Sequence, residues 1–252
     1  MPQLQFHWYG FLIGLALVVG LYFTEALFKK RNIPTDFYWQ LVAFVIVGGI
    51  VGSRLWHVAT SYQYYVGQWQ RAFEVWNGGL SIIGTVVGAA VTFVLYFLLN
   101  PKWKKYQLIA LDLSVFGLAL GQAIGRLGNY VNQELYGTPT QLPWGIFIDE
   151  AHRLPGYSLI THYHPLFAYE ALLMILFFFL ASRLQKTIFK VGTGALFGFY
   201  VFYYSWIRFG LDFLRIDKLT YLPLNLGVNQ IFLAIVGVLS AFYLFFQLRK
   251  GE

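Results

Sequence analysis

The sequence of 252 residues contains no cysteine, and only 12% of its residues are charged. The lack of thiols excludes disulfides, thiolate metal sites and a cysteine nucleophile within the chain. A soluble domain carries roughly 25% charged residues, so most of this chain's surface is not water-facing. Hydrophobic residues make up 58% of the sequence and aromatic residues 20%. This composition predicts a protein embedded in a lipid bilayer, with aromatic side chains at both interfaces.

A membrane-spanning helix needs about 20 mostly apolar residues. Seven stretches of the sequence meet this requirement. They are residues 10–28, 38–59, 79–99, 107–127, 164–183, 194–213 and 227–248. The first follows an uncharged start without a cleavage-site pattern, so we expect a retained span and not a signal peptide. The prediction is an all-α integral membrane protein, with residues 1–252 forming a single seven-helix membrane domain. Small residues spaced four apart, such as Gly48 and Gly52, predict close helix–helix packing.

Lysine and arginine are distributed unequally between the two sets of alternate loops. Eleven lie in the segments that follow the odd-numbered spans and four in the others. Because basic loops stay in the cytoplasm, the N-terminus is predicted outside and the C-terminus in the cytoplasm. The formal net charge of +7 then reflects topology, and no nucleic-acid partner is expected. The outer loop at 128–163 is too long for a turn and is predicted to form a small extracytoplasmic cap.

Charged residues inside the predicted spans require a reason. An isolated charge at the bilayer centre costs about 2.5–3.5 kcal/mol on insertion scales. The charged residues inside the spans include Arg54, Arg126, Glu170, Arg208 and Asp212. One interpretation is that they form ion pairs that hold the fold, as Arg208 and Asp212 can do at a spacing of four. The other is that the arginines bind a phospholipid phosphate, whose oxygens a guanidinium contacts bidentately.

The densest polar cluster is GRLGNYVNQELYG at residues 125–137. Arg126, Asn129, Asn132 and Glu134 crowd the end of a predicted span, which is more than capping of a helix needs. The segment resembles the signature of the phosphatidylglycerol–prolipoprotein diacylglyceryl transferase family, G-R-x-x-N-F-x-N-x-E-x-x-G. Tyr130 stands at the Phe position of that signature.

Four shorter stretches resemble the same family in order and spacing. They are Trp8–Gly10 (W-Y-G), Trp76–Ser81 (W-x-G-G-M/L-S), His164–Glu170 (H-P-x-x-x-Y-E) and Arg208–Arg215 (R-x-x-x-E-F-x-R). The resemblance implies a multi-pass protein of the bacterial cytoplasmic (inner) membrane that uses no cofactor and no metal. It implies transfer of the diacylglyceryl group of phosphatidylglycerol to the lipobox cysteine of a preprolipoprotein signal peptide, with release of glycerol 1-phosphate. The substrate supplies the thiol that this chain lacks.

The resemblance also assigns roles by position. Arg126 and Arg208 correspond to the pair that handles the phosphate, and Asn129 and Glu134 to essential polar residues, so these four are the predicted catalytic residues. The predicted substrate-binding residues are Arg126, Tyr9, Asn132, Gly137, His164, Tyr169, Glu170, Asp212 and Arg54. Arg54 has no motif support and is equally interpreted as structural.

One departure from the family pattern is serious. The family usually reads G-G-M-S-F-H-G-G, and Ile83 occupies the place of its histidine, which is proposed to transfer a proton. Either another group activates the thiol, or the homologue binds lipid or lipoprotein without the usual catalysis. A thiol with a pKa near 8.5 is partly ionised at neutral pH, and arginines lower that pKa further.

Four residues are candidate substitutes for the missing base: Glu134, His164, Tyr9 and Glu170. We favour Glu134 because it belongs to the signature segment, although it is equally interpreted as a salt-bridge partner of Arg126. A transporter is a third reading, but the spans do not pair as repeated halves.

Overall fold

The computed structural model describes residues 7–216 and 226–249. Seven long helices fall on the seven predicted stretches. They are α1 (Trp8–Lys30), α2 (Thr35–Thr60), α4 (Ile82–Leu99), α5 (Gln107–Val131), α6 (Leu166–Leu184), α7 (Ala195–Leu211) and α8 (Val228–Arg249). Within the described ranges, six helices are long and apolar enough to cross a membrane. The chain is therefore an all-α integral membrane protein, as predicted.

Helix α7 is the one long helix outside that group of six. It has 17 residues and continues into the short 3-10 helix η5 (Asp212–Leu214). A seventh crossing and the orientation of the N-terminus remain predictions. The chain divides into two compact units, Phe28–Gln107 and the combination of Met1–Leu27 with Leu108–Glu252, which are described separately below.

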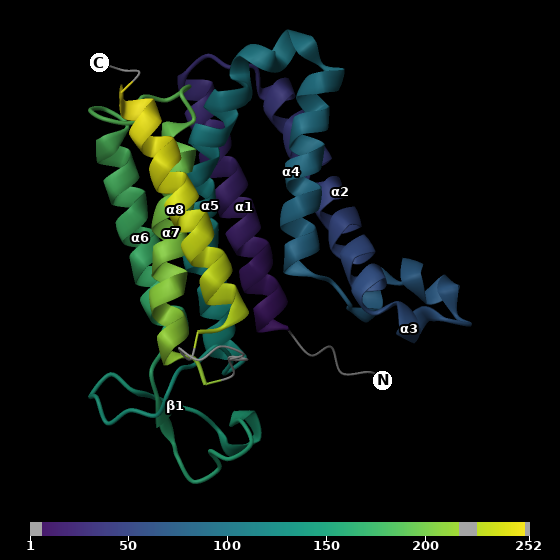
Figure 1. Cartoon of the computed structure of the whole chain (residues 1–252), viewed down its shortest axis with the longest axis vertical. Coiled ribbons are helices and arrows are strands. Elements are labelled where there is room, and N and C mark those ends of the chain that lie inside the picture. Colours follow the sequence, from purple (N-terminus) through teal and green to yellow (C-terminus); the bar gives the residue numbers. More distant parts are fainter. Residues whose placement is uncertain (1–6, 217–225, 250–252) are drawn as a thin grey trace. The chain divides into compact units, whose positions relative to one another are not determined.

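The unit Phe28–Gln107 is built on the pair α2 and α4, which lie side by side in Figure 1. A Cβ added to Gly52 would lie 2.5 Å from the carbonyl oxygen of Gly84, and one added to Gly88 would lie 2.2 Å from that of Gly48. No larger residue fits at such contacts, so the predicted small-residue packing is confirmed. Between these helices the chain forms α3 (Tyr62–Tyr65) and the 3-10 helices η1 (Trp69–Phe73) and η2 (Val75–Asn77), and η3 (Pro101–Tyr106) follows α4.

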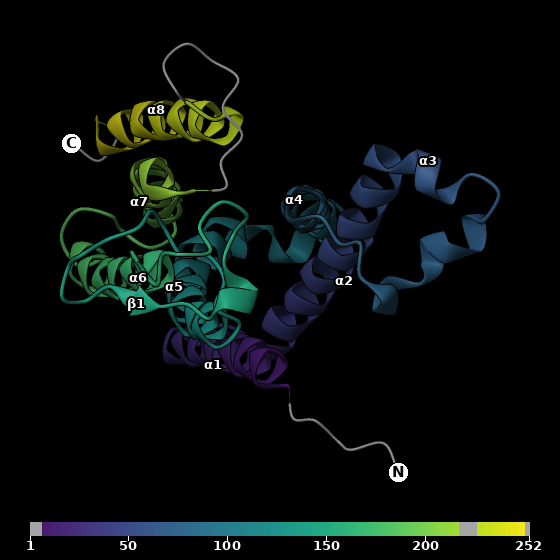
Figure 2. The same cartoon turned by 90° about the horizontal axis from the view of Figure 1, so that it is seen from below.

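The other unit packs α1, α5, α6, α7 and α8 together, with α7 between α6 and α8 (Figure 2). Its core is an apolar cluster that includes the fully buried Met174, Phe177 and Leu196. Asp112 of α5 is also fully buried, and its carboxylate accepts hydrogen bonds from the backbone N–H groups of Gly192, Gly194 and Phe197. These bonds cap the start of α7 and fix it to α5.

The segment between α5 and α6 folds into a small substructure of its own. Strand β1 (Ile146–Phe147) pairs antiparallel with β2 (His162–Tyr163), and the 3-10 helix η4 (Glu150–His152) lies between them. Tyr136, Ile148 and Tyr163 form its hydrophobic core, and burial raises the pKa of the Tyr163 hydroxyl. Helix α5 runs to Val131, so the first residues of the predicted cap, 128–131, are helical instead. Its extracytoplasmic location remains a prediction.

Candidate active site

The site begins at the last turn of α5, where two predicted residues contact each other. Arg126 donates through Nη1 to Asn129 Oδ1 at 3.1 Å, and Asn129 donates through Nδ2 to Glu134 Oε1 at 2.7 Å. The backbone N–H of Glu134 also donates to the carbonyl of Asn129 at 2.9 Å. The chain thus folds back after the helix and holds three signature side chains in one hydrogen-bonded series.

The turn that brings Glu134 back to Asn129 has a strained backbone. Gln133 and Leu135, on either side of Glu134, have φ of 50° and 55°, a region that costs a residue other than glycine about 1–3 kcal/mol. The Gln133 side chain compensates by two hydrogen bonds with Asp149, because its Nε2 donates to Oδ2 and its Oε1 accepts from the backbone N–H. Through these two hydrogen bonds the cap fixes the turn that keeps Glu134 in contact with Asn129.

Glu170 of α6 joins the two predicted phosphate-binding arginines. Its Oε1 lies 2.5 Å from Nη2 of Arg126 on α5, and its Oε2 lies 3.0 Å from Nη1 of Arg208 on α7. The Glu170 side chain is 2% exposed, whereas those of Arg126 and Arg208 are 21% and 16% exposed. One buried carboxylate thus fixes two guanidinium groups that still reach the surface of the bundle.

The ion-pair network continues to the end of α7. Asp212 Oδ1 accepts from Nη2 of Arg208 at 3.1 Å and lies 3.6 Å from Nη1 of Arg215. The expected local pair between Arg208 and Asp212 is therefore present. Arg126 and Arg208 keep 21% and 16% of their side chains exposed, so an anionic ligand can reach guanidinium donors that the two buried carboxylates do not occupy.

Gly137, the last residue of the signature, ties three of the resembling segments together. Its N–H donates to the carbonyl of His164 at 2.8 Å, and it forms an isolated bridge with Arg215. A Cβ on Gly137 would lie 2.8 Å from the carbonyl oxygen of Leu214 and 3.1 Å from Cβ of His164. Only glycine fits between the start of α6 and the end of α7, which explains the residue type.

His164 and Tyr169 form a second cluster beside the network. His164 Nδ1 lies 3.0 Å from the Tyr169 hydroxyl, which also accepts from Nε1 of Trp144 at 2.8 Å. Tyr9 packs its ring against Gly128, since a Cβ there would lie 3.0 Å from its Cδ2. Asn132 is exposed at the end of α5. The structure thus brings most predicted site residues to one end of the α5–α6–α7 bundle.

For two residues the contacts bear on alternatives that the sequence left open. The carboxylate partner of Arg126 is Glu170 and not Glu134, because Glu134 bonds to Asn129 instead. Arg54 belongs to the other unit, and its guanidinium donates to the backbone carbonyls of Arg71, Ala72, Glu74, Gly78 and Gly79. These five bonds use all five of its N–H groups. The structural interpretation of Arg54 is therefore favoured over the substrate-binding one.

Tyr204 is a site residue that the sequence analysis did not identify. Its hydroxyl donates to Glu170 Oε1 at 3.4 Å, the same oxygen that accepts from Arg126. Tyr204 lies four residues before Arg208 on α7, and that spacing puts both on one helix face. This spacing was the signal available in the sequence.

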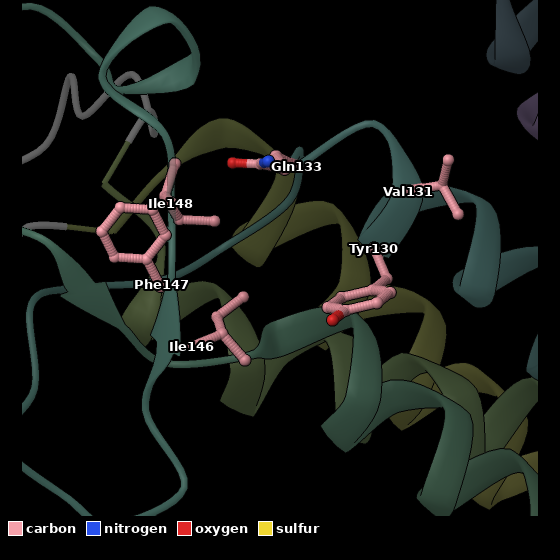
Figure 3. Close-up of a pocket in the computed structure, with 6 residues that line it drawn as sticks. All are labelled: Tyr130, Val131, Gln133, Ile146, Phe147 and Ile148. Carbon is pink, nitrogen blue, oxygen red and sulfur yellow. The ribbon is translucent and has the colours of Figure 1, made fainter.

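Two apolar pockets open beside the network, between the end of α5 and the cap. The first, with a volume of about 380 Å³, is lined by Tyr130, Val131, Gln133 and the three residues Ile146–Ile148. In Figure 3 the Tyr130 ring points toward Ile146 across this pocket. The second, of about 560 Å³, shares Tyr130 and Ile146 and extends along the first turns of α6 to Leu172.

Comparison with known proteins supports the assignment of these motifs to one protein family. The profile of the family described as prolipoprotein diacylglyceryl transferase matches residues 1–247. A Gloeobacter violaceus protein is 36% identical over 227 residues, 86% of this chain and 80% of its own. A Synechocystis protein is 34% identical over 246 residues, 94% and 85% of the two chains.

A third relative, from Thermotoga maritima, is 34% identical over 249 residues, covering 98% of this chain and 83% of its own. All three are named phosphatidylglycerol–prolipoprotein diacylglyceryl transferase. The match spans both compact units and every segment of the arginine site. The chain therefore belongs to the prolipoprotein diacylglyceryl transferase family.

Proposed function

We propose that this protein transfers the diacylglyceryl group of phosphatidylglycerol to the thiol of a prolipoprotein cysteine. In this reaction the sulfur attacks the glyceryl carbon that carries the phosphate. A carbon–sulfur bond forms, the bond from that carbon to the phosphate oxygen breaks, and its electron pair leaves with glycerol 1-phosphate. The thiol proton passes to a base. The observation that carries this proposal is that Glu170 forms ion pairs with both Arg126 and Arg208.

The arginine pair suits a phosphodiester. Among the described residues, two of the five N–H groups of each guanidinium are used, by Asn129 and Glu170 for Arg126 and by Glu170 and Asp212 for Arg208. Three donors on each remain for phosphate oxygens, and both side chains are partly exposed. Guanidinium donors would bind the ground-state phosphate and stabilise the charge that grows on the leaving oxygen.

Glu134 is the best-placed base of the four candidates. Its side chain is exposed, and Asn129 orients one of its oxygens. Both oxygens of Glu170 are bonded to cationic donors, and Nδ1 of His164 contacts the Tyr169 hydroxyl. Tyr9 is placed through its ring against Gly128. In our proposal Glu134 accepts the thiol proton, while the arginines favour the thiolate.

We further propose that the reaction takes place at the outer face of the bacterial inner membrane, on the lipobox cysteine of the signal peptide. The unequal distribution of basic loops supports an outer location for the site end of α5 and for the cap beyond it. Phosphatidylglycerol in the outer leaflet would present its phosphate near the interface, at the depth of the arginine network. No cofactor is part of this proposal, because the attacking thiol comes from the peptide.

The proposal is tested by release of glycerol phosphate from phosphatidylglycerol vesicles that contain the purified protein and a lipobox peptide. We expect Arg126→Ala and Arg208→Ala to lose release almost entirely. Arg183→Ala, an exposed arginine in the last turn of α6, is the matched control and should keep it. Undiminished release in both site variants would refute the assigned roles.

A second candidate function is binding of lipid or lipoprotein without catalysis. Ile83, at the position where the family pattern has histidine, favours it because isoleucine accepts no proton. Ile83 lies in the first turn of α4 and is 52% exposed. Phosphatidylglycerol binding without turnover in the wild type, followed by turnover in Ile83→His, would support this alternative.

A further inference from the structure

Strand β2 is the middle of three short segments in the cap. On one side, Thr140 donates to the carbonyl of His162 at 3.1 Å, and His164 donates to that of Thr138 at 3.1 Å. On the other side, β2 pairs with β1, with Ile146 opposite Tyr163 and Phe147 opposite His162. Strand β1 is therefore an edge strand of this small arrangement.

The alternating hydrogen bonds show in which direction the backbone N–H and C=O groups of each β1 residue point. Ile148 donates to the carbonyl of Thr161 at 3.0 Å, so Ile148 and Ile146 face β2. In an antiparallel ladder the intervening residue faces away, and the N–H and C=O of Phe147 therefore point outward. Neither group has a hydrogen-bond partner in the part of the chain that the structure describes.

The next backbone group that points outward, the N–H of Asp149, already has a hydrogen-bond partner. The N–H of Asp149 donates to Oε1 of Gln133 at 2.6 Å, so a side-chain carbonyl stands where a neighbouring strand would present a backbone carbonyl. The edge then continues to Phe147 with both groups free, beside the pocket of about 380 Å³ lined by Tyr130 and Ile146. Figure 3 shows Gln133 at the Ile148 end of this pocket.

We propose that the outer edge of β1 binds the extended segment around the target cysteine of the prolipoprotein, by addition of a strand at Phe147. The inference rests on the proposed function for the identity of the peptide. A free N–H next to a free C=O on a strand edge matches the backbone of an extended peptide, with adjoining pockets for alternate apolar side chains. A phospholipid offers ester carbonyls but no N–H, so it matches only half of this pair.

The pocket beside the edge and the arginine network share one segment of the chain. Gln133, which ends the free edge, directly precedes Glu134, and Tyr130 on the pocket wall directly follows Asn129. We refer to the edge at Phe147 and the adjoining pocket together as the groove. In this proposal a peptide residue paired with Phe147 would direct its neighbours toward Glu134.

The test uses two substitutions of Phe147 that separate backbone from side chain. Both Phe147→Ala and Phe147→Pro remove the ring, but only Phe147→Pro also removes the outward N–H. Proline is tolerated on an edge strand when its nitrogen faces away from the ladder. We expect Phe147→Pro to raise the KM for the lipobox peptide about five- to tenfold above that of Phe147→Ala, the loss of one hydrogen bond, while the KM for phosphatidylglycerol stays unchanged.

A binding measurement separates this inference from the proposed activity. Phe147→benzoyl-phenylalanine, a photoreactive residue, should cross-link the lipobox peptide whether or not turnover occurs. The same substitution at Ile188, exposed beyond the far end of α6, is the control. An active wild type without cross-linking at Phe147, with equal peptide KM values for the proline and alanine variants, would overturn the peptide groove. A rise in the phosphatidylglycerol KM of the proline variant would assign the groove to lipid instead and also overturn it.

Discussion

Arg126 of α5 and Glu170 of α6 form an ion pair at 2.5 Å, with the carboxylate almost completely buried. Because Arg208 bonds to the other oxygen of the same carboxylate, Glu170 sets the separation of the two guanidinium groups. The geometry of the arginine pair is thus determined by a residue of the neighbouring helix and not by the arginines alone. These charges hold α5, α6 and α7 together, and in the proposed reaction the two arginines would also bind the phosphate.

We expect Glu170→Gln to be strongly destabilising. Removing one partner of a buried ion pair leaves uncompensated charge and costs about 3–5 kcal/mol. The melting temperature of the detergent-solubilised protein should fall clearly, whereas Glu150→Gln, an exposed acid of the cap, should leave it unchanged. Equal melting temperatures for the two variants would show that Glu170 does not hold the network together.

Glu134→Gln should reduce turnover without loss of the fold. General-base assistance contributes typically ~10²–10⁴-fold, so the rate at neutral pH should fall within that range. The deficit should shrink as the pH rises toward the ordinary thiol pKa of about 8.5, because the peptide then ionises unaided. A pH–rate profile parallel to that of the wild type would indicate that another group, or solvent, takes the proton.

Arg54→Lys should loosen the segment between α2 and α4 while leaving the lipid site intact. Lysine has three N–H donors instead of five and cannot reproduce the bonds to five backbone carbonyls. Amide hydrogen exchange over residues 69–79 should accelerate, and the control Arg71→Lys, at an exposed arginine of η1, should not change it. A raised KM for phosphatidylglycerol with unchanged exchange would restore the substrate-binding interpretation of Arg54.

Two glycines of the signature should respond in opposite ways to alanine. In Gly137→Ala the new methyl group meets the backbone carbonyl of Leu214 at 2.8 Å, and overpacking of this kind costs about 1–3 kcal/mol. In Gly125→Ala the nearest atom is Ile13 Cδ1 at 3.7 Å, and alanine in a helix gains about 0.5–1 kcal/mol over glycine. Melting temperatures check both, and a neutral Gly137→Ala would contradict the tight junction of α6 and α7.

The helices and the site motifs were predictable from the sequence because both depend on local patterns. Apolar runs of sufficient length predicted all seven long helices, and the spacing of Arg208 and Asp212 predicted their ion pair. The partner of Arg126 was not predictable, since Glu170 lies 44 residues away and only the packing of α5 against α6 brings it there.

Two further features depended on folding that no short pattern encodes. The five carbonyls around Arg54 converge because the chain turns through η1 and η2. The turn at Gln133 is held by Asp149, which the cap returns to the end of α5. In both cases backbone groups or cap residues, without a distinctive sequence signal, complete the contact.

The central claim is that the arginine network promotes displacement of phosphate from phosphatidylglycerol by a peptide thiol. Its most direct test is mass spectrometry of a lipobox peptide after incubation of the purified protein with phosphatidylglycerol vesicles, alongside a peptide in which serine replaces the cysteine. The account predicts a diacylglyceryl thioether on the cysteine peptide, one glycerol phosphate released per thioether, and neither product with the serine peptide. Binding of phosphatidylglycerol without any thioether, at neutral or alkaline pH, would contradict it.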